Sequence, residues 1–261
     1  MTKFNHYIQI NKESWNQRTP IHINSDFYNN NDFIKGENSL KPIELNAIGN
    51  VQEKSLLHLQ CHFGQDSISF ARIGAEVTAI DFSDIAINEA KKLSKATNTH
   101  VNFIESDVLN LNLNKKFDIV FASYGTIGWL PDLSKWATTI STHLKSGGIF
   151  LLTEFHPFLE MIKDNEQNYF YNPKPNIEIQ KGTYTDGGDN LITQTCWWNH
   201  SLTDIFKALE SKDLKLILFE EFDYSPFCLE GMIKKEDGKY ILKKRKKKST
   251  PYVFTIKAIK K

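Results

Sequence analysis

Short runs of almost uninterrupted apolar residues recur through the middle of the chain, each followed by a longer polar segment. Strands that are apolar on both sides are typical of parallel sheets covered on both faces, whereas half-exposed strands alternate. The five runs predict strands at 55–60, 75–80, 101–104, 117–122 and 149–154. The pattern therefore predicts an α/β fold with a largely parallel sheet.

Segments with helical spacing lie between these strands. The segment 66–73 ends before Gly74, a residue suited to a helix C-terminus. Ser83 can cap a helix that runs to about residue 96 and has a single apolar face. A third helix is expected at 132–144 and stops before Gly147. Helices between parallel strands cover the two faces of the sheet.

The two flanks of this pattern differ from it. Residues 1–50 are polar and asparagine-rich, which favours short helices or a cap. Residues 158–199 contain two strand-like runs around a glycine turn, and we expect them to form a lid-like insertion over the ligand edge of the sheet. We therefore expect an N-terminal helical cap, 1–50, and one domain, 51–261, that carries this insertion. The remaining predicted elements are a helix at 201–211 and strands at 214–222 and 252–259.

Composition narrows the class of protein. With 261 residues, 40% of them hydrophobic, the chain fits one large domain. No apolar stretch reaches the roughly 18–20 residues of a membrane span, and the N-terminus does not resemble a secretory signal. The three cysteines, Cys61, Cys196 and Cys228, are scattered without metal-like spacing. These observations favour a cytoplasmic protein with no metal site and no membrane association.

The net charge of +1 hides a basic C-terminal segment. Residues 234–261 include 12 basic and 2 acidic residues, with an unbroken basic run at 243–248. Such a run can bind a nucleic acid backbone or anionic lipid, and it is also typical of a solvated loop. Because lysine is abundant throughout the chain, the sequence favours the solvated loop.

Polar residues follow five of the predicted strands. They are the segment 60–66, Asp81, Asp107, the segment 123–125 and the segment 154–157. The carboxyl ends of parallel strands meet at one edge of the sheet, where α/β proteins bind nucleotide-like ligands. The tight turn at Gly64, which opens a helix, fits the same interpretation. The sequence therefore predicts a ligand site at this edge.

These motifs resemble those of the class I S-adenosylmethionine-dependent methyltransferases. The segment 57–64, Leu-His-Leu-Gln-Cys-His-Phe-Gly, lies where the family has an acidic residue and three alternating glycines, and it looks like a bacterial subgroup with no assigned substrate. His58 replaces the acid, Gln60 and His62 replace two glycines, and the third glycine is Gly64. Later motifs match at 77–83, 105–108, 117–120 and 144–151. The resemblance implies a seven-stranded Rossmann-like sheet, mostly parallel with an antiparallel last strand, and helices on both faces.

The resemblance implies S-adenosyl-L-methionine as the cofactor and roles for the residues that follow the second and third strands. Asp81 would accept hydrogen bonds from both ribose hydroxyls, and Phe82 would cover one face of the adenine. Asp107 and the Val108 backbone would bind the adenine edge, while Ser83 begins the adjacent helix. As alternatives, Asp81 could simply cap that helix and Asp107 could be a turn residue.

The methionine part of the cofactor would lie on the turn after the first strand. Its residues would be Gln60, Cys61, His62, Gly64 and Asp66, with Ser123 near the sulfonium. Arg18, one of few arginines, would suit the methionine carboxylate. The missing glycines leave two readings open, an active enzyme and a protein that binds the cofactor without catalysis.

Catalysis is less clearly marked in the sequence. Methyl transfer from a sulfonium is an in-line displacement, so a base is needed only for a protonated nucleophile. His156 is the candidate catalytic base, followed by Glu154 and His200.

We expect a monomeric or homodimeric enzyme that methylates a small molecule. The alternative is an RNA methyltransferase or a nucleic acid-binding module that uses the basic run. A nicotinamide-dependent reductase fits poorly, because no Gly-x-Gly-x-x-Gly motif is present.

Overall fold

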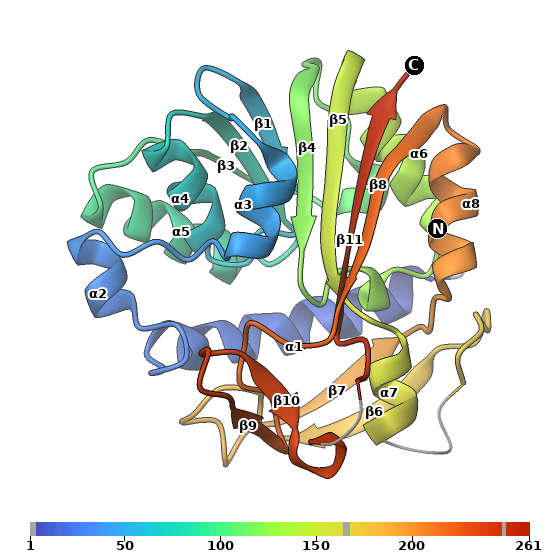
Figure 1. Ribbon diagram of the computed structural model, residues 1–261. Coiled ribbons are helices and arrows are strands. Elements are labelled where there is room, and N and C mark those ends of the chain that lie inside the picture. Colours follow the sequence, from blue (N-terminus) through green and yellow to red (C-terminus); the bar gives the residue numbers. More distant parts are fainter. Residues whose placement is uncertain (1–3, 164–167, 247–248) are drawn as a thin grey trace.

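A seven-stranded sheet forms the centre of the molecule (Figure 1). The computed structural model describes residues 4–163, 168–246 and 249–261. The strands lie in the order β3-β2-β1-β4-β5-β11-β8, and β11 runs antiparallel to both β5 and β8. Their bounds are Ser55–His58 (β1), Glu76–Asp81 (β2), Asn102–Glu105 (β3), Phe117–Ser123 (β4), Leu144–Phe155 (β5), Leu214–Phe222 (β8) and Val253–Lys260 (β11). The predicted α/β sheet with an antiparallel last strand is confirmed.

Alternate residues of the central strands supply two separate cores. Leu56 and Phe121 pack on the face that α4 (Gln65–Arg72) and α5 (Asp84–Ala96) cover. Leu57 and Val120 pack on the opposite face, which α6 (Leu133–His143) and α8 (Leu202–Glu210) cover. Because successive side chains of a strand point to opposite faces, both sets must be apolar. This explains the unbroken apolar runs in the sequence.

The fifth strand begins earlier than its apolar run. Leu144 pairs with Phe117, and the register then shifts before Ile119 pairs with Ile149. A Cβ atom on Gly148 would lie 2.9 Å from the carbonyl oxygen of Lys145, so only glycine fits this irregular stretch. The glycines that were expected to precede the strand therefore lie inside it.

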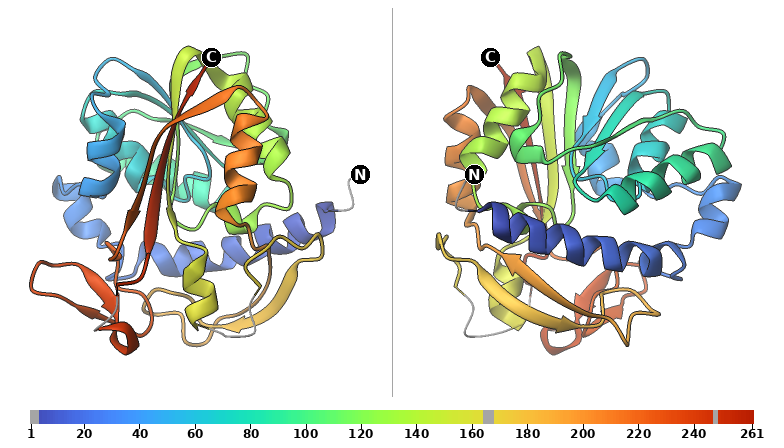
Figure 2. Two further views of the ribbon diagram at one scale, coloured as in Figure 1. Left: turned by 45° about the vertical axis from the view of Figure 1, so that its right-hand side comes forward. Right: turned by 180° about the vertical axis from the view of Figure 1, so that it is seen from behind.

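The N-terminal segment folds mainly as one long helix, α1 (Asn5–Ile23), followed by α2 (Asn30–Lys35) and α3 (Pro42–Ile48). Helix α1 passes across the carboxyl ends of the strands and lies between the sheet and a hairpin (Figures 1 and 2). Strands β6 (Asn176–Lys181) and β7 (Ile192–Trp197) form this hairpin within the predicted insertion. The insertion begins with α7 (Phe158–Lys163), and its residues 164–167 lie outside the described part.

A second hairpin separates β8 from β11. It consists of β9 (Met232–Lys234) and β10 (Tyr240–Leu242), and a turn of 3-10 helix, Lys243–Arg245, follows it. The predicted basic run therefore begins as a helical turn, and its residues 247–248 lie outside the described part. No helix within the described ranges is long and apolar enough to cross a membrane.

Candidate functional site

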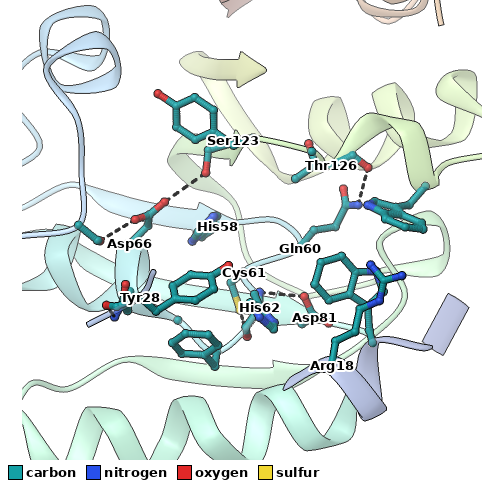
Figure 3. Close-up of a pocket in the computed structure, with 18 of the residues that line it drawn as sticks. Arg18, Tyr28, His58, Gln60, Cys61, His62, Asp66, Asp81, Ser123 and Thr126 are labelled. Atoms are coloured by element: carbon teal, nitrogen blue, oxygen red, sulfur yellow. Dashed lines mark hydrogen bonds between the residues drawn. The ribbon is translucent and has the colours of Figure 1, made fainter. Parts of the chain in front are cut away.

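A cavity of about 510 Å³ lies where the carboxyl ends of the strands meet α1 and the β6–β7 hairpin (Figure 3). The order of the strands reverses between β1 and β4, and such a switch point opens a crevice in α/β sheets. Most of the residues expected at the site line this cavity. They are Arg18, Gln60, Cys61, His62, Gly64, Asp66, Asp81, Phe82, Asp107, Val108 and Ser123.

The turn after β1 has a left-handed backbone at every second residue. The φ angles are 54° at Gln60, 51° at His62 and 84° at Gly64. These are the positions at which the resemblance expects glycine, so the turn keeps the glycine conformation although two positions carry side chains. A left-handed residue with a Cβ atom costs about 1–2 kcal/mol, which the surrounding contacts must offset.

Hydrogen bonds hold this turn in place. The Cys61 N–H donates to the carbonyl of Ile80 (2.8 Å), and the His62 N–H donates to the Asp81 carboxylate (2.9 Å). The Gln60 side chain donates to the carbonyl of Thr126 (2.9 Å). Its amide oxygen Oε1 has no hydrogen-bond partner within the described residues. The side chain of Gln60 thus connects the turn to the segment after β4.

Asp81 lies at the end of β2 with both carboxylate oxygens engaged by the backbone. It accepts hydrogen bonds from the N–H groups of His62 and Ser83, each at 2.9 Å. Burial raises its pKa to about 6. Each carboxylate oxygen can accept more than one hydrogen bond, so the group remains able to bind a ligand hydroxyl. Asp81 therefore holds the backbone just before α5 and also forms a wall of the cavity.

Ser83 and Asp107 are held by their own local structure. The Ser83 hydroxyl accepts from the Ala86 N–H (3.0 Å) and donates to the Asn16 side chain (2.6 Å), so it caps α5 and lies outside the cavity lining. Ser83 thus supports the position of Asp81 and does not itself face the cavity. Asp107 accepts a hydrogen bond from the Leu109 N–H (2.9 Å) and also faces the cavity.

Arg18 is a buried cation with no acidic partner. Its side chain is only 3% exposed, and it donates to Gln180 (2.7 Å) and Thr193 (3.1 Å) on the hairpin. Within the described residues no carboxylate pairs with it, and its Nε has no partner. Burial lowers its pKa from the usual value. An unpaired guanidinium is costly to bury, so this wall of the cavity fits an anionic group of a ligand.

A neutral histidine and a nearby carboxylate replace the acid that the resemblance expects at position 58. Burial lowers the pKa of His58 to about 4, and its ring lies 2.8 Å from the Ser67 hydroxyl. The neighbouring carboxylate is Asp66, which accepts hydrogen bonds from Ser39 (2.6 Å) and Ser123 (3.2 Å). The negative charge of this corner therefore comes from α4 rather than from β1.

Residues 56–148 match the family model described as "Methyltransferase domain". This part of the chain is therefore similar to a methyltransferase domain. A protein of Methanocaldococcus jannaschii, named there as uncharacterized, is 30% identical over 179 residues, which make up 67% of this chain and 47% of that protein. The chain thus spans about half the length of the curated relative that it matches.

Solved structures share the fold of the methyltransferase domain. An S-adenosylmethionine-dependent methyltransferase from Clostridium acetobutylicum has a TM-score of 0.58 and 18% identity, over 96% of this chain and 98% of that one. The glycopeptide N-methyltransferase MtfA, complexed with S-adenosylmethionine, has a TM-score of 0.55 and 16% identity, over 84% and 92%. The chain thus shares its fold with these methyltransferases.

The candidate base His156 lies outside the cavity of the methyltransferase domain. Its Nδ1 accepts from the Phe158 N–H (3.1 Å), and its Nε2 lies 2.9 Å from the Glu221 carboxylate. Its backbone N–H pairs with the carbonyl of Tyr252, next to β11, which turns the residue away from the ligand edge. The structure therefore does not bring His156 to the site, although it follows the fifth strand as expected.

The two other base candidates are held by structural contacts. The buried Glu154 carboxylate accepts the backbone N–H groups of Gly125, Thr126 (2.7 Å) and Ile127 (3.2 Å). The His200 ring lies 2.8 Å from the carbonyl of Leu130 and stacks on Tyr171. Glu154 thus fixes the segment after β4 in the methyltransferase domain.

Sequence reasoning included Tyr124 in the segment 123–125 at the ligand edge but missed its partner, Glu44. Tyr124 follows β4 with a left-handed φ of 43° and lines the cavity. Its hydroxyl donates to the Glu44 carboxylate of α3 at 2.8 Å. In the sequence, Glu44 follows Pro42 by two residues and indicates only a helix start, so no local pattern could have connected it with Tyr124.

No group of three or more histidine, cysteine, aspartate or glutamate side chains in the described residues is arranged to hold a metal ion.

Proposed function

We propose that the protein transfers a methyl group from S-adenosylmethionine to a small-molecule acceptor. The observation that carries the proposal is the buried Asp81 carboxylate beside the left-handed turn at 60–64. When bound, the cofactor supplies a methyl group on a positively charged sulfur. In-line transfer from it depends mainly on positioning, which an enclosed cavity favours.

The residues that line the cavity fit the charges of this cofactor. Asp81 would accept the ribose hydroxyls, and Phe82, Asp107 and Val108 would bind the adenine. The unpaired Arg18 suits the methionine carboxylate, and Asp66 suits its ammonium group. This assignment would give the buried guanidinium of Arg18 the anionic partner that the protein itself does not provide.

The enclosure of the cavity supports a small acceptor. Residues 1–50 would act as a cap and 158–199 as a lid on the domain 51–261. Three aromatic rings form the wall beyond the β4 segment, with centroid separations of 5.6 Å between Tyr124 and Phe155 and 4.8 Å between Tyr124 and Phe227. Such a wall suits an acceptor with an apolar or aromatic body.

Titration calorimetry with S-adenosylmethionine tests the proposal. Asp81→Asn should weaken binding about 10- to 100-fold, because a charge-assisted pair with the ribose is lost. Asp84→Asn, a matched change on the first turn of α5 outside the cavity lining, should leave the affinity unchanged. Equal affinities for Asp81→Asn and the wild type would contradict the assignment. Binding without methyl transfer to any acceptor would favour the reading as a cofactor-binding protein.

A further inference from the structure

The backbone at and after Tyr124, a residue that lines the cavity, is fixed by hydrogen bonds. The Tyr124 N–H donates to the carbonyl of Thr153 at 2.7 Å, and Glu154 binds the three backbone N–H groups that follow. A left-handed tyrosine is strained, and such strain persists only where the surroundings fix it. The segment after β4 is therefore built to keep this side chain in one place.

Glu44 is a buried carboxylate whose main side-chain contact is Tyr124. Its side chain is 1% exposed; one oxygen accepts from the Lys41 N–H (2.7 Å) and the other from the Tyr124 hydroxyl (2.8 Å). No lysine, arginine or histidine of the described residues forms an ion pair with it. The carboxylate therefore has no cation to hold its charge.

The surroundings of Glu44 raise its affinity for a proton. Burial and the nearby Asp66 raise its pKa to about 7. The groups that face it are the Lys41 N–H of its own helix, Tyr124 after β4, Asp66 on α4 and Tyr224 after β8. A carboxyl group with this pKa can exchange a proton near neutral pH, which is what proton transfer at pH 7 requires.

We propose that Tyr124 is the catalytic proton acceptor of this site and that Glu44 positions its hydroxyl and receives its proton. The inference rests on the proposed methyl transfer and deepens it. It assigns the acceptor to molecules whose nucleophilic nitrogen or oxygen carries a proton, namely amines and alcohols.

The proton transfer balances with the methyl transfer. The proton of the acceptor N–H or O–H passes to Tyr124 Oη while the phenolic proton passes to Glu44 Oε2. The electron pair of the broken N–H or O–H bond stays on the acceptor atom, which bonds the methyl carbon. The pair of the broken carbon–sulfur bond returns to sulfur, and Glu44 later releases its proton to water.

A measurement without any ligand tests the coupling of the two residues. In protein labelled with ¹³Cζ-tyrosine, the resonance of Tyr124, assigned with Tyr124→Phe, should shift with a midpoint near pH 7. Glu44→Gln should abolish that shift and leave the other tyrosines unchanged. A Tyr124 resonance that is flat between pH 5.5 and 8.5 in the wild type would overturn the proposal.

Methyl transfer from labelled S-adenosylmethionine to three probes tests the assigned chemistry. The probes 2-phenylethylamine, 2-phenylethanol and phenylacetate share an aromatic body that suits the wall, and only the first two have a nucleophile with a proton to lose. The amine or the alcohol should be labelled. Tyr124→Phe should lower that rate about 100-fold, and Glu44→Gln should remove the loss of rate below pH 7.

Measuring the affinity for S-adenosylmethionine distinguishes a failure of this inference from a failure of the proposed function. Both variants should bind S-adenosylmethionine within twofold of the wild type. The inference is overturned if only phenylacetate is labelled or if no probe is labelled. It is also overturned if Tyr124→Phe transfers the methyl group at the wild-type rate. A wild type that does not bind S-adenosylmethionine contradicts the proposed function itself.

Discussion

Single buried groups set the charge of the cavity, and Asp81 is the one whose ionisation matters most for the cofactor. A carboxylate accepts hydrogen bonds from both ribose hydroxyls only when it is ionised. In this structure burial outweighs the two backbone hydrogen bonds and holds the pKa of Asp81 at about 6. If Asp81 binds the ribose as proposed, cofactor binding should depend on pH just below neutrality.

We expect the affinity for S-adenosylmethionine to fall about tenfold between pH 7.5 and pH 5. At pH 5 a group with a pKa of about 6 is roughly one-tenth ionised, and only the ionised form binds the ribose as proposed. Calorimetric titrations across this range measure the change. In Asp81→Asn the affinity should be low and independent of pH. A wild-type affinity that does not change would show that Asp81 does not bind the cofactor as a carboxylate.

Glu44 should reduce the stability of the fold at alkaline pH. Its pKa rises from 4.5 to about 7 on folding, so the folded state binds a proton that the unfolded state has lost between these values. Stability therefore falls as the pH rises from about 4.5 to 7, by up to about 3 kcal/mol. Urea unfolding should find Glu44→Gln more stable than the wild type at pH 8 and similar at pH 4. The control is Glu37→Gln, a change at an exposed residue. If Glu44→Gln gained less stability at pH 8 than at pH 4, the predicted pH dependence would be wrong.

At the scale of elements, the turn between β1 and α4 tolerates side chains at two of its three left-handed positions but not at Gly64. A Cβ atom on Gly64 would lie 2.5 Å from Cζ of Phe103, whose ring is buried. Gly238, in the β9–β10 hairpin, has a similar φ of 83° and nothing within 4 Å of its Cβ position. Comparing substitutions at these two glycines therefore distinguishes the cost of backbone strain from the cost of steric contact.

Gly64→Ala should lower the free energy of unfolding by about 1–3 kcal/mol more than Gly238→Ala. Both changes force alanine into a left-handed backbone, and only the first overpacks the core against Phe103. Chemical denaturation of the two variants measures the difference. Equal losses would mean that Phe103 moves aside without cost.

The sequence predicted the parallel strands and the helices between them because their side chains are buried on predictable faces. It did not predict the length of α1, since the buried side chains of this helix are polar. They are Asn11, Ser14, Arg18, Thr19 and His22. Asn11, for example, hydrogen-bonds both the N–H and the carbonyl of Cys196 in the hairpin. A helix that is bound through polar contacts has no apolar stripe by which its sequence could be identified.

The candidate site was predictable mainly where strand ends determine it. Asp81 and Asp107 follow strands, and strand ends converge at one edge whatever the loops do. Tyr124 and Glu44 meet because α3 packs against β5 and β11, and 80 residues separate them in the chain. His156 failed as a candidate because its turn faces β11, and a sequence pattern does not fix the direction of a turn.

At the scale of the whole molecule, the sheet, helix α1 and the segments around both hairpins line the same cavity. Its lining includes Trp15 from α1, Tyr184 from the insertion and Phe227 from the segment after β8. The Tyr184 hydroxyl lies 2.5 Å from that of Tyr28, which joins the insertion to the cap. A ligand in the cavity would thus contact all of these parts at once.

S-adenosylmethionine should therefore raise the melting temperature of the whole protein in a single transition. At 100 times its dissociation constant a ligand adds about 2.7 kcal/mol, which corresponds to roughly 5–11 °C for a domain of this size. Differential scanning calorimetry with and without the cofactor measures the shift. A second transition that does not move with the cofactor would show that the cap or the insertion unfolds independently.

The left-handed residues Gln60 and His62 place polar side chains in the cavity wall, which a turn made of glycines could not do. A glycine turn presents only backbone groups to a ligand. This turn adds the amide of Gln60 and the imidazole of His62 to the lining of the cavity. The imidazole of His62 already lies 3.0 Å from that of His22, so a residue of the turn reaches up to the cap. The turn therefore has left-handed dihedral angles at the three positions where the resemblance expects glycine, while two of these positions carry functional groups.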